Sequence, residues 1–555
     1  MVLRVREFLA KRGFVKDDEG SIIVFIMVVF SAMFLVGGTA VDLARHENLR
    51  ATMQYNLDRA VLAAASLKQS EDPEVIVQDY MSRVVAIDTF TVNVQKDVNI
   101  NSRWVSATAN AELDTWFLSM AGINNMPIRA HSEAEERIPN LEISLVLDVS
   151  GSMSGSKLTN LKVAAKEFVT TMLGNVDPDT VSISVVPFNH NVAPSVNLFD
   201  ALSKDEKHDY STCLDFQDSA FGSTAINPAV SQTHAVYTSL TGSWDALNDS
   251  RKTCYTEDEF EILPHQQSVS KLHTKIDGLS ADGWTAAHMG LKWGLALLDP
   301  AFQPVVTSLT NVEATDPDKI DAGFDGIPVA WTDPDTMKVV VLMGDGANTY
   351  EFRMGSEYRG ANSDVYEVNY TVQTFQYAYH KKKPWKTSTS ESKCSKKKWI
   401  CIYESEDYTD YYLKDGSQYL DIEDSNWITQ TAFNNLPATL PGWTSTDQLD
   451  WEEAWGRMPA DWYDNHTGED AYDDLVWGTG RTSGEADTVM NSACNIARTN
   501  GIVVYTIGYE TNATTSEKLR NCATTTAHYH DAAGTQISTV FAAIAASIQK
   551  LKLTQ

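Results

Sequence analysis

One uncharged stretch limits what this chain can fold into more than any other feature. Residues 21–40 read "SIIVFIMVVFSAMFLVGGTA", twenty residues without a charged side chain. Twenty helical residues rise about 30 Å, the thickness of the hydrocarbon core of a bilayer. A cleaved signal peptide is the alternative, but its apolar region spans only about 7–15 residues. Helical character without Gly or Pro also continues through residues 41–69. We therefore expect a retained transmembrane helix over residues 21–41.

The residues before this stretch are basic: Arg4, Arg6, Lys11, Arg12 and Lys16. An excess of lysine and arginine marks the cytoplasmic side of a membrane helix. Residues 1–20 are therefore expected to form a cytoplasmic tail. The remainder of the chain would lie outside the cytoplasm, in the periplasm or beyond the cell.

The formal net charge of the chain is −30 and its pI is near 4.7. A protein binds nucleic acids and anionic lipid surfaces through cationic patches on its own surface. The composition therefore argues against nucleic acid or an anionic membrane as the main ligand, and it suits solubility, divalent cations or a salty habitat alike.

Six cysteines are spread through the export-side part of the chain: Cys213, Cys254, Cys394, Cys401, Cys494 and Cys522. None forms a CxxC pair, so a zinc site is not expected. An even number of cysteines outside the cytoplasm favours disulfides over buried thiols. Proximity along the chain favours the pairs Cys213–Cys254, Cys394–Cys401 and Cys494–Cys522.

Residues 42–136 predict a small α+β stalk. The helix is expected to continue over residues 42–70, and alternating apolar residues indicate strands at 92–100 and 103–113. A short helix capped by Asp114 is expected over residues 114–123, followed by a strand at 126–137.

Residues 137–555 are expected to form an α/β domain with a doubly wound, mostly parallel sheet, because buried-strand patterns alternate with helical ones. Strands are expected at 141–150, 179–189, 335–348 and 502–510, and helices at 156–173, 269–279, 285–298, 485–501 and 537–553. Ser156 is the expected cap of the first helix. Residues 191–264 and 351–484 interrupt the alternation and are interpreted as insertions. The second contains eight of the fourteen tryptophans and is expected to have a small core of its own.

Five oxygen-bearing side chains are expected at the carboxyl edge of this sheet. Asp148, Ser150 and Ser152 share the turn "DVSGS", Asp345 follows another apolar strand, and Thr285 begins a helix. Ligands bind at this edge of a doubly wound sheet. Two carboxylates and three hydroxyls suit a hard cation, and they leave it short of negative charge, so a partner could supply one more carboxylate. Turn and capping chemistry is the alternative interpretation.

This constellation resembles the metal-ion-dependent adhesion site of von Willebrand factor A domains. The turn "DVSGS", the loop "DGWT" and the strand end "VVVLMGDG" match the three parts of the family's pattern in order, with Gly344 where a threonine often stands. The resemblance implies that Asp148, Ser150, Ser152, Thr285 and Asp345 bind one divalent cation. Mg²⁺ is the expected ion, with Mn²⁺ and Ca²⁺ as alternatives.

The N-terminal part resembles TadG-like proteins of the bacterial tight-adherence (Flp) pilus system. The matching positions are Gly20-Ser21, Val41-Asp42, Gln54 and Leu57-Asp58-Arg59-Ala60. The resemblance implies a single-pass protein of the bacterial inner membrane, with the pilus machinery as its protein partner.

Two function classes remain open. The first is a membrane-anchored binding component of pilus assembly, and the second is a surface adhesin that binds a host or substratum through the same metal site. An enzyme is not expected, because the chain has no GxSxG, HExxH or Walker A motif. His288, His528 and His530 are expected to be ordinary core or surface histidines.

Overall fold

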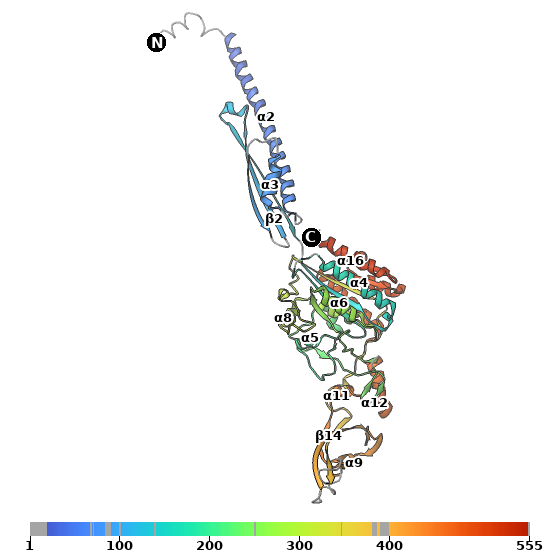
Figure 1. The fold of residues 1–555 in the computed structure, drawn as a ribbon. Helices are drawn as coiled ribbons and strands as arrows, with labels where there is room; N and C mark the ends of the chain where they lie inside the picture. Colours follow the sequence, from blue (N-terminus) through green and yellow to red (C-terminus); the bar gives the residue numbers. More distant parts are fainter. Residues whose placement is uncertain are drawn as a thin grey trace. The chain divides into compact units, whose positions relative to one another are not determined.

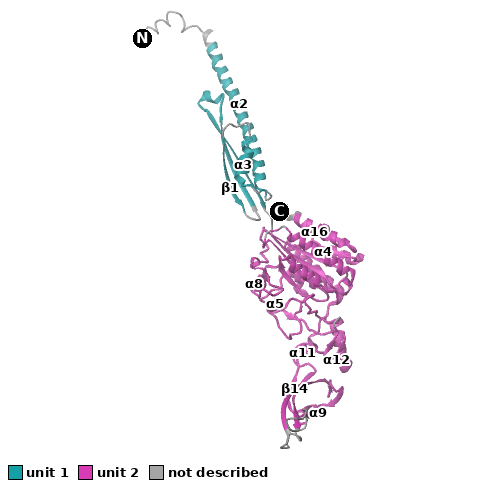
Figure 2. Ribbon diagram, viewed as in Figure 1, with its two compact units in different colours: residues 1–138 teal, residues 139–555 magenta. Residues whose placement is uncertain are grey.

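The computed structural model describes residues 19–66, 69, 71–83, 90–98, 102–137, 140–174, 176, 178–248, 251–345, 347–379, 386–388 and 399–552. The chain forms two compact units, residues 1–138 and residues 139–555 (Figure 2).

The first unit packs two helices on a three-stranded antiparallel sheet (Figure 1). Its elements are α2 (Glu19–Ala64), α3 (Pro73–Ser82), β1 (Phe90–Val98), β2 (Ser102–Asp114) and β3 (Asn125–Arg137). Apolar residues from one side of α2, such as Met53, Leu57 and Val61, meet Val77 of α3 and Val105 of β2 in a closed core. The second half of α2 is therefore part of a folded domain.

The expected helix over residues 114–123 is wrong. Asp114 is the last residue of β2 and pairs with Asn125 across a hairpin. Only a 3₁₀ turn, η1 (Leu118–Ala121), lies between the strands, and no side chain caps it. The connection is too short for an α-helix, and Gly122 closes it with a φ of 88° that glycine adopts readily.

The first half of α2 is largely exposed. Among the described residues, the helix Ile22–Ala64 is the one that is long and apolar enough to cross a membrane, judged by length and composition alone. A membrane anchor and a signal sequence both fit that description. The helix ends at Ala64, short of the expected residue 70, and residues 67, 68 and 70 lie outside the described ones.

The second unit is built on a six-stranded sheet with the order β10-β5-β4-β11-β18-β19. The strands are β4 (Asn140–Asp148), β5 (Val181–Phe188), β10 (Leu263–Gln266), β11 (Thr336–Gly344), β18 (Val503–Tyr509) and β19 (Tyr529–Ala532). All neighbours are parallel except β10, which runs antiparallel to β5. The mixed α/β class expected from the sequence is confirmed.

Helices cover both faces of this sheet. On one face lie α4 (Ser156–Leu173), α6 (Val269–Gly278) and α16 (Gln536–Lys552), and on the other α7 (Ala287–Ala296), α8 (Gln303–Leu309), α14 (Ser483–Thr499) and α15 (Ala513–Cys522). Alternate residues of β4 pack on opposite faces of the sheet. Val146 belongs to one apolar cluster, and Leu145 and Leu147 belong to the other. Burial on both faces explains the continuous apolar runs of these strands.

Ser156 begins α4 but does not cap it. The capping position is Gly155, and no side chain accepts a hydrogen bond from the first turn.

Residues 191–264 carry little regular structure. Their elements are α5 (Val196–Asp200), η3 (Asp218–Gly222) and four two-residue strands, β6 (Leu214–Asp215), β7 (Thr233–His234), β8 (Gly242–Ser243) and β9 (Ala246–Leu247).

Residues 351–484 form a second, antiparallel sheet of order β13-β12-β14-β15-β16, with β17 paired to β12. The strands are β12 (Val365–Tyr379), β13 (Lys386–Ser388), β14 (Trp399–Asp415), β15 (Gln418–Asp421), β16 (Asn426–Thr429) and β17 (Trp443–Gln448). The helices are α9 (Gln430–Asn434), α10 (Leu436–Thr439), α11 (Trp451–Trp455), α12 (Ala460–Thr467) and α13 (Ala471–Asp473).

The core of residues 351–484 is not entirely their own. Trp451, Trp455 and Tyr463 are buried in it, as expected for a tryptophan-rich core, but Val236 and Leu240 from residues 191–264 complete it. The two interrupting segments therefore share one apolar cluster.

Candidate functional site

Two aspartates meet at one edge of the main sheet because their strands are neighbours. Strand β4 ends at Asp148, and β11 ends at Gly344, one residue before Asp345. The two strands are parallel, with Leu147 paired to Met343. Parallel strands present their carboxyl ends at the same edge, so the pairing brings both carboxylates together. Both aspartates are buried.

The turn after β4 joins these carboxylates through its two serines. The Ser150 and Ser152 hydroxyls lie 3.0 Å apart, and Ser152 Oγ donates to Asp345 Oδ1 at 2.7 Å. Asp148 Oδ1 accepts from the Ser150 amide at 2.9 Å, and Asp148 Oδ2 accepts from the Asp345 amide at 3.3 Å. Four of the five predicted residues thus form one hydrogen-bonded cluster of oxygens.

Thr285 lies on the adjoining loop. The Gly151 amide donates to the Gly283 carbonyl at 2.9 Å, which ties this loop to the serine turn. On its other side, the Thr285 amide donates to Thr349 Oγ1 at 2.9 Å, and the Thr349 amide returns a bond to the Thr285 carbonyl at 2.8 Å. The Thr285 side chain shares no hydrogen bond with the other four predicted residues, all of which are described.

Gly283 is the residue that lets the loop pass so close. Its φ is +78°, and an added Cβ would lie 2.8 Å from His190 Nδ1 and 3.0 Å from the Tyr255 ring. Any side chain here would push the loop away from the serine turn.

The electrostatics of the cluster disfavour two free carboxylates. Burial raises the pKa of Asp148 to about 7, and the nearby Asp345 carboxylate adds to the shift. The Lys157 ammonium, 2.7 Å from Asp345 Oδ2, supplies positive charge at the edge of the cluster. Lys157, the second residue of α4, was not predicted as part of this cluster, because its partner Asp345 lies 188 positions further along the chain.

The donor set is compatible with a hard cation. Two buried carboxylates and two serine hydroxyls present oxygen alone, the ligand type that Mg²⁺ and Ca²⁺ prefer. In the part of the chain that the structure describes, no group of three or more His, Cys, Asp or Glu side chains is arranged to hold a metal ion. A site here would therefore depend on its hydroxyls as much as on its carboxylates.

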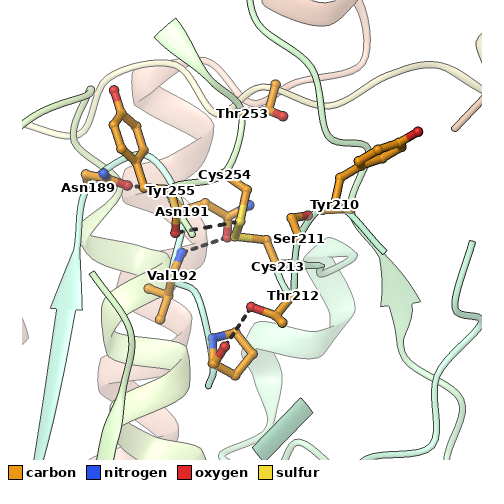
Figure 3. Close-up of a disulfide and its surroundings, with 12 residues drawn as sticks. Asn189, Asn191, Val192, Tyr210, Ser211, Thr212, Cys213, Thr253, Cys254 and Tyr255 are labelled. Atoms are coloured by element: carbon orange, nitrogen blue, oxygen red, sulfur yellow. Dashed lines mark hydrogen bonds between the residues drawn. A yellow bond between two sulfur atoms is a disulfide. The ribbon is translucent and has the colours of Figure 1, made fainter. Parts of the chain in front are cut away.

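A disulfide lies beside this edge of the sheet. Cys213 is bonded to Cys254, as expected, next to the turn at Asn189–Asn191 that follows β5 (Figure 3). Tyr255, the next residue, has its ring centroid 5.4 Å from that of His190. The bridge therefore fixes residues next to the loop that carries Thr285.

The second expected disulfide, Cys494–Cys522, is also confirmed. Cys522 is the last residue of α15, a helix that was not predicted from the sequence. Cys401 is disulfide-bonded, but its expected partner Cys394 lies outside the described residues.

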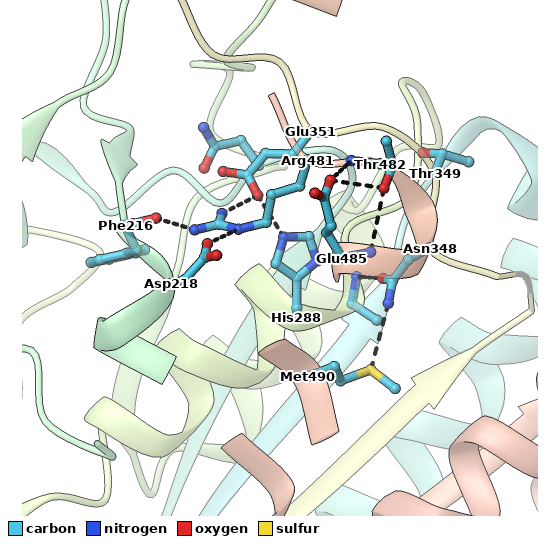
Figure 4. A network of polar contacts seen from close by, with 12 residues as sticks. Phe216, Asp218, His288, Asn348, Thr349, Glu351, Arg481, Thr482, Glu485 and Met490 are labelled. Carbon is cyan, nitrogen blue, oxygen red and sulfur yellow. Dashed lines mark hydrogen bonds and ion pairs between the residues drawn. The ribbon is translucent and has the colours of Figure 1, made fainter. Parts of the chain in front are cut away.

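A network of charged and polar side chains joins the two ends of residues 351–484 (Figure 4). His288 Nε2 is 2.7 Å from Glu351 Oε2, and the Arg481 guanidinium pairs with the same oxygen. Arg481 Nε also bonds Asp218 Oδ1 at 2.8 Å. Burial alone would raise the pKa of Glu351, but the His288 hydrogen bond and the Arg481 charge outweigh it and lower the pKa to about 2. His288 is therefore a partner in a structural network.

Residues 142–234 match the family model described as the von Willebrand factor type A domain. The chain contains a von Willebrand factor type A domain. The matched residues include Asp148, Ser150 and Ser152, whereas Thr285 and Asp345 lie beyond them. No match was found among curated proteins.

Solved structures with a likeness to this chain include three from bacterial pili. They are the vWF domain of the type V pili tip protein Mfa5 from Porphyromonas gingivalis (13% identity, covering 74% of this chain and 96% of that chain, TM-score 0.32), the pilus adhesin RrgA from Streptococcus pneumoniae (11%, 83% and 49%, 0.29) and the pilus adhesin SpaC from Lactobacillus rhamnosus GG (10%, 83% and 34%, 0.28). The chain spans less than half the length of the last two. TM-scores this low support no statement about the function of this von Willebrand A domain.

Proposed function

We propose that this protein is a membrane-anchored component of a tight-adherence pilus assembly system that binds a protein partner through a divalent cation. The observation that carries the proposal is the oxygen cluster of Asp148, Ser150, Ser152 and Asp345 at the carboxyl edge of the sheet. Thr285, on the adjoining loop, is proposed as the fifth ligand. Mg²⁺ is the proposed ion, and Mn²⁺ and Ca²⁺ are the alternatives.

Three of the five proposed ligands are neutral hydroxyls, so a bound divalent cation is left short of negative charge, and the binding of a partner follows from this. The bound cation would supply an open coordination position for a carboxylate of the partner. The serine hydroxyls orient the site, and the Ser152 hydrogen bond holds Asp345 in place. Lys157, which pairs with Asp345, would give way or share that carboxylate. On this basis the protein is a binding protein and has no catalytic role.

Helix α2 is proposed to be retained in the bacterial inner membrane over residues 21–41, with residues 1–20 in the cytoplasm and the remainder in the periplasm or outside the cell. Residues 42–136 would form a TadG-like stalk. Residues 137–555 would form a doubly wound von Willebrand A domain with insertions at 191–264 and 351–484.

Calorimetry and partner capture on the full chain in detergent test the metal site together. Wild-type protein should bind Mg²⁺ or Mn²⁺ with a measurable heat and should retain an envelope partner that EDTA releases. Asp148→Ala should remove both, because it deletes one of only two carboxylates. Asp277→Ala, at an exposed carboxylate that pairs with Lys166 and with none of the five proposed ligands, is the matched control and should change neither. Wild-type capture in EDTA would contradict the proposal.

The alternative function is that of a surface adhesin that uses the same site toward a host or substratum. Protease treatment of intact cells separates the two. A periplasmic von Willebrand A domain is protected until the outer membrane is opened, whereas an adhesin domain is cleaved at once.

A further inference from the structure

The tip of the β2–β3 hairpin packs directly against the apolar part of α2. Phe117, at the tip, has its ring centroid 5.4 Å from that of Phe34 in an edge-to-face contact. Gly38 makes the approach possible, because a Cβ at that position would lie 2.4 Å from the Phe117 ring. Phe34 and Gly38 both belong to the uncharged run of residues 21–40. The hairpin tip therefore overlaps the segment proposed to cross the membrane.

Asp42 holds the tip in this position. Its carboxylate is fully buried and accepts from three successive backbone amides of the tip: Trp116 at 3.1 Å, Phe117 at 2.8 Å and Leu118 at 2.8 Å. Arg45 adds charge from one turn further along, 3.5 Å from Asp42 Oδ1. Asp42 is the first charged residue after the uncharged run. A carboxylate beside a bilayer is costly unless it is paired, and here the tip satisfies it.

The tip presents apolar side chains that stay largely exposed among the described residues. Trp116, Met120 and Ile123 are 63%, 70% and 49% exposed. Residues 115–128 contain no charged side chain. The guanidinium of Arg45 lies 3.5 Å from the centroid of the Trp116 ring, a pairing of an aromatic with a cation that suits the level of lipid headgroups.

The positions of Phe34, Gly38 and Asp42 along α2 agree with a shallow insertion of the hairpin tip into the bilayer. Gly38 and Phe34 lie about 6 Å and 12 Å along the helix from Asp42, given a rise of about 1.5 Å per residue. The helix from Ile22 to Asp42 spans about 30 Å, which matches one hydrocarbon core. A bilayer whose outer boundary lies near Asp42 would therefore reach the tip, and the apolar side chains of the tip would enter its interfacial layer.

We propose that the β2–β3 hairpin tip, residues 115–124, is a membrane-interfacial loop that inserts its exposed apolar side chains into the outer leaflet beside α2. This inference rests on the proposed retention of α2 as a membrane anchor. The ligand is the headgroup and upper acyl region of a phospholipid bilayer. With two points of contact, helix and loop, the stalk would be restrained against tilting and rotation about the helix axis.

Site-directed spin labelling of the full chain in phosphatidylcholine–phosphatidylglycerol vesicles tests the loop. The described cysteines are all bonded, so one introduced thiol is labelled selectively. Labels are placed by Met120→Cys at the tip, by Val28→Cys within the run, and by Val98→Cys at the end of β1, which lies at the opposite end of β2 from the tip. Collision with oxygen reports lipid, and collision with a water-soluble nickel chelate reports solvent.

The expected result is that oxygen dominates at Met120→Cys and Val28→Cys, and nickel dominates at Val98→Cys. Nickel dominance at Met120→Cys with oxygen dominance at Val28→Cys would overturn the loop and leave the anchor intact. Protection of Met120→Cys from both reagents would also overturn it, because protein would then cover the tip. Nickel dominance at Val28→Cys would overturn the anchor and the loop together.

Discussion

Asp148 combines complete burial with a proposed role as a metal ligand. It is fully enclosed, it faces a second carboxylate, and burial raises its pKa to about 7. Because the pKa in the folded protein lies above the ordinary value of 3.8, the unfolded chain releases this proton first as pH rises. The contribution of Asp148 to stability is therefore present below pH 4 and is lost as pH rises toward 7. A bound cation would offset that loss.

The proton and the proposed cation should compete at Asp148. Below pH 7, Mg²⁺ affinity should fall about tenfold for each pH unit, since one proton must leave for each ion bound. Calorimetry between pH 5.5 and 8 measures this directly, and proton release is checked in two buffers with different ionisation enthalpies. Equal affinity at pH 5.5 and 7.5 would contradict the role of Asp148 as a ligand.

Arg481 is expected to stabilise the fold, because it neutralises the buried carboxylate of Glu351. Arg481→Gln should lower the free energy of unfolding by about 3 kcal/mol, because it removes the guanidinium partner of a buried carboxylate. Lys166→Gln, which breaks the exposed pair with Asp277, is the matched control and should cost less than about 1 kcal/mol. Urea unfolding of the full chain in detergent compares the two. A similar loss in both variants would show that Glu351 does not depend on Arg481.

Those residues of the candidate site that stand in a recognisable local sequence pattern could be predicted from the sequence. Asp148, Ser150 and Ser152 share one turn, and Asp345 follows an apolar strand. The pairing of Lys157 with Asp345 joins residues 188 positions apart, and that of Arg481 with Glu351 joins residues 130 apart. No local pattern encodes such pairings, because they arise from strand order and loop placement.

At the scale of elements, the strands buried on both faces were the most predictable, because their apolar runs leave few alternatives. The strand β10 and the helix α15 were missed. β10 reads "LPHQ", too short and polar for a strand pattern, and it pairs irregularly with β5. The helix α15 reads "ATTSEKLRNC", and few of its residues are apolar. Packing against β18 and the bond to Cys494 hold this helix in place.

The bridge between α14 and α15 should contribute to stability at this same scale. Cys494→Ser/Cys522→Ser opens a loop of 28 residues and should lower the free energy of unfolding by about 3 kcal/mol on the loop-entropy model. Cys213→Ser/Cys254→Ser, with a separation of 41, closes a similar loop and should cost a similar amount. Chemical unfolding under non-reducing conditions measures both. A double-serine variant as stable as the wild type would refute the contribution.

At the scale of the whole molecule, the two units have separate cores. One apolar cluster is made only of residues before 138, and the clusters around the main sheet contain only residues after 139. The sequence anticipated the α/β class and the apolar helix. It did not anticipate that residues 191–264 and 351–484 share one core, since each segment alone has too little apolar patterning to indicate a partner.

Residues 139–555 should therefore fold without residues 1–138. The isolated fragment is expected to unfold cooperatively, with a midpoint within a few degrees of the corresponding transition in the full chain, because no core residue is lost. Differential scanning calorimetry compares the fragment with the full chain in detergent. A fragment without a cooperative transition would show that residues 1–138 are needed for folding.

The meeting of Glu351 and Arg481 has an evolutionary consequence. Their backbones form a single antiparallel bridge, so residues 351–484 begin and end at nearly the same point. A segment whose ends are already joined can be lengthened, shortened or exchanged without moving the strands of the host sheet. Related genes can therefore diverge in this segment while the proposed cation site is kept, provided that a replacement also covers Val236 and Leu240. Exchange of this segment offers a route to the recognition of different partners while the main sheet stays the same.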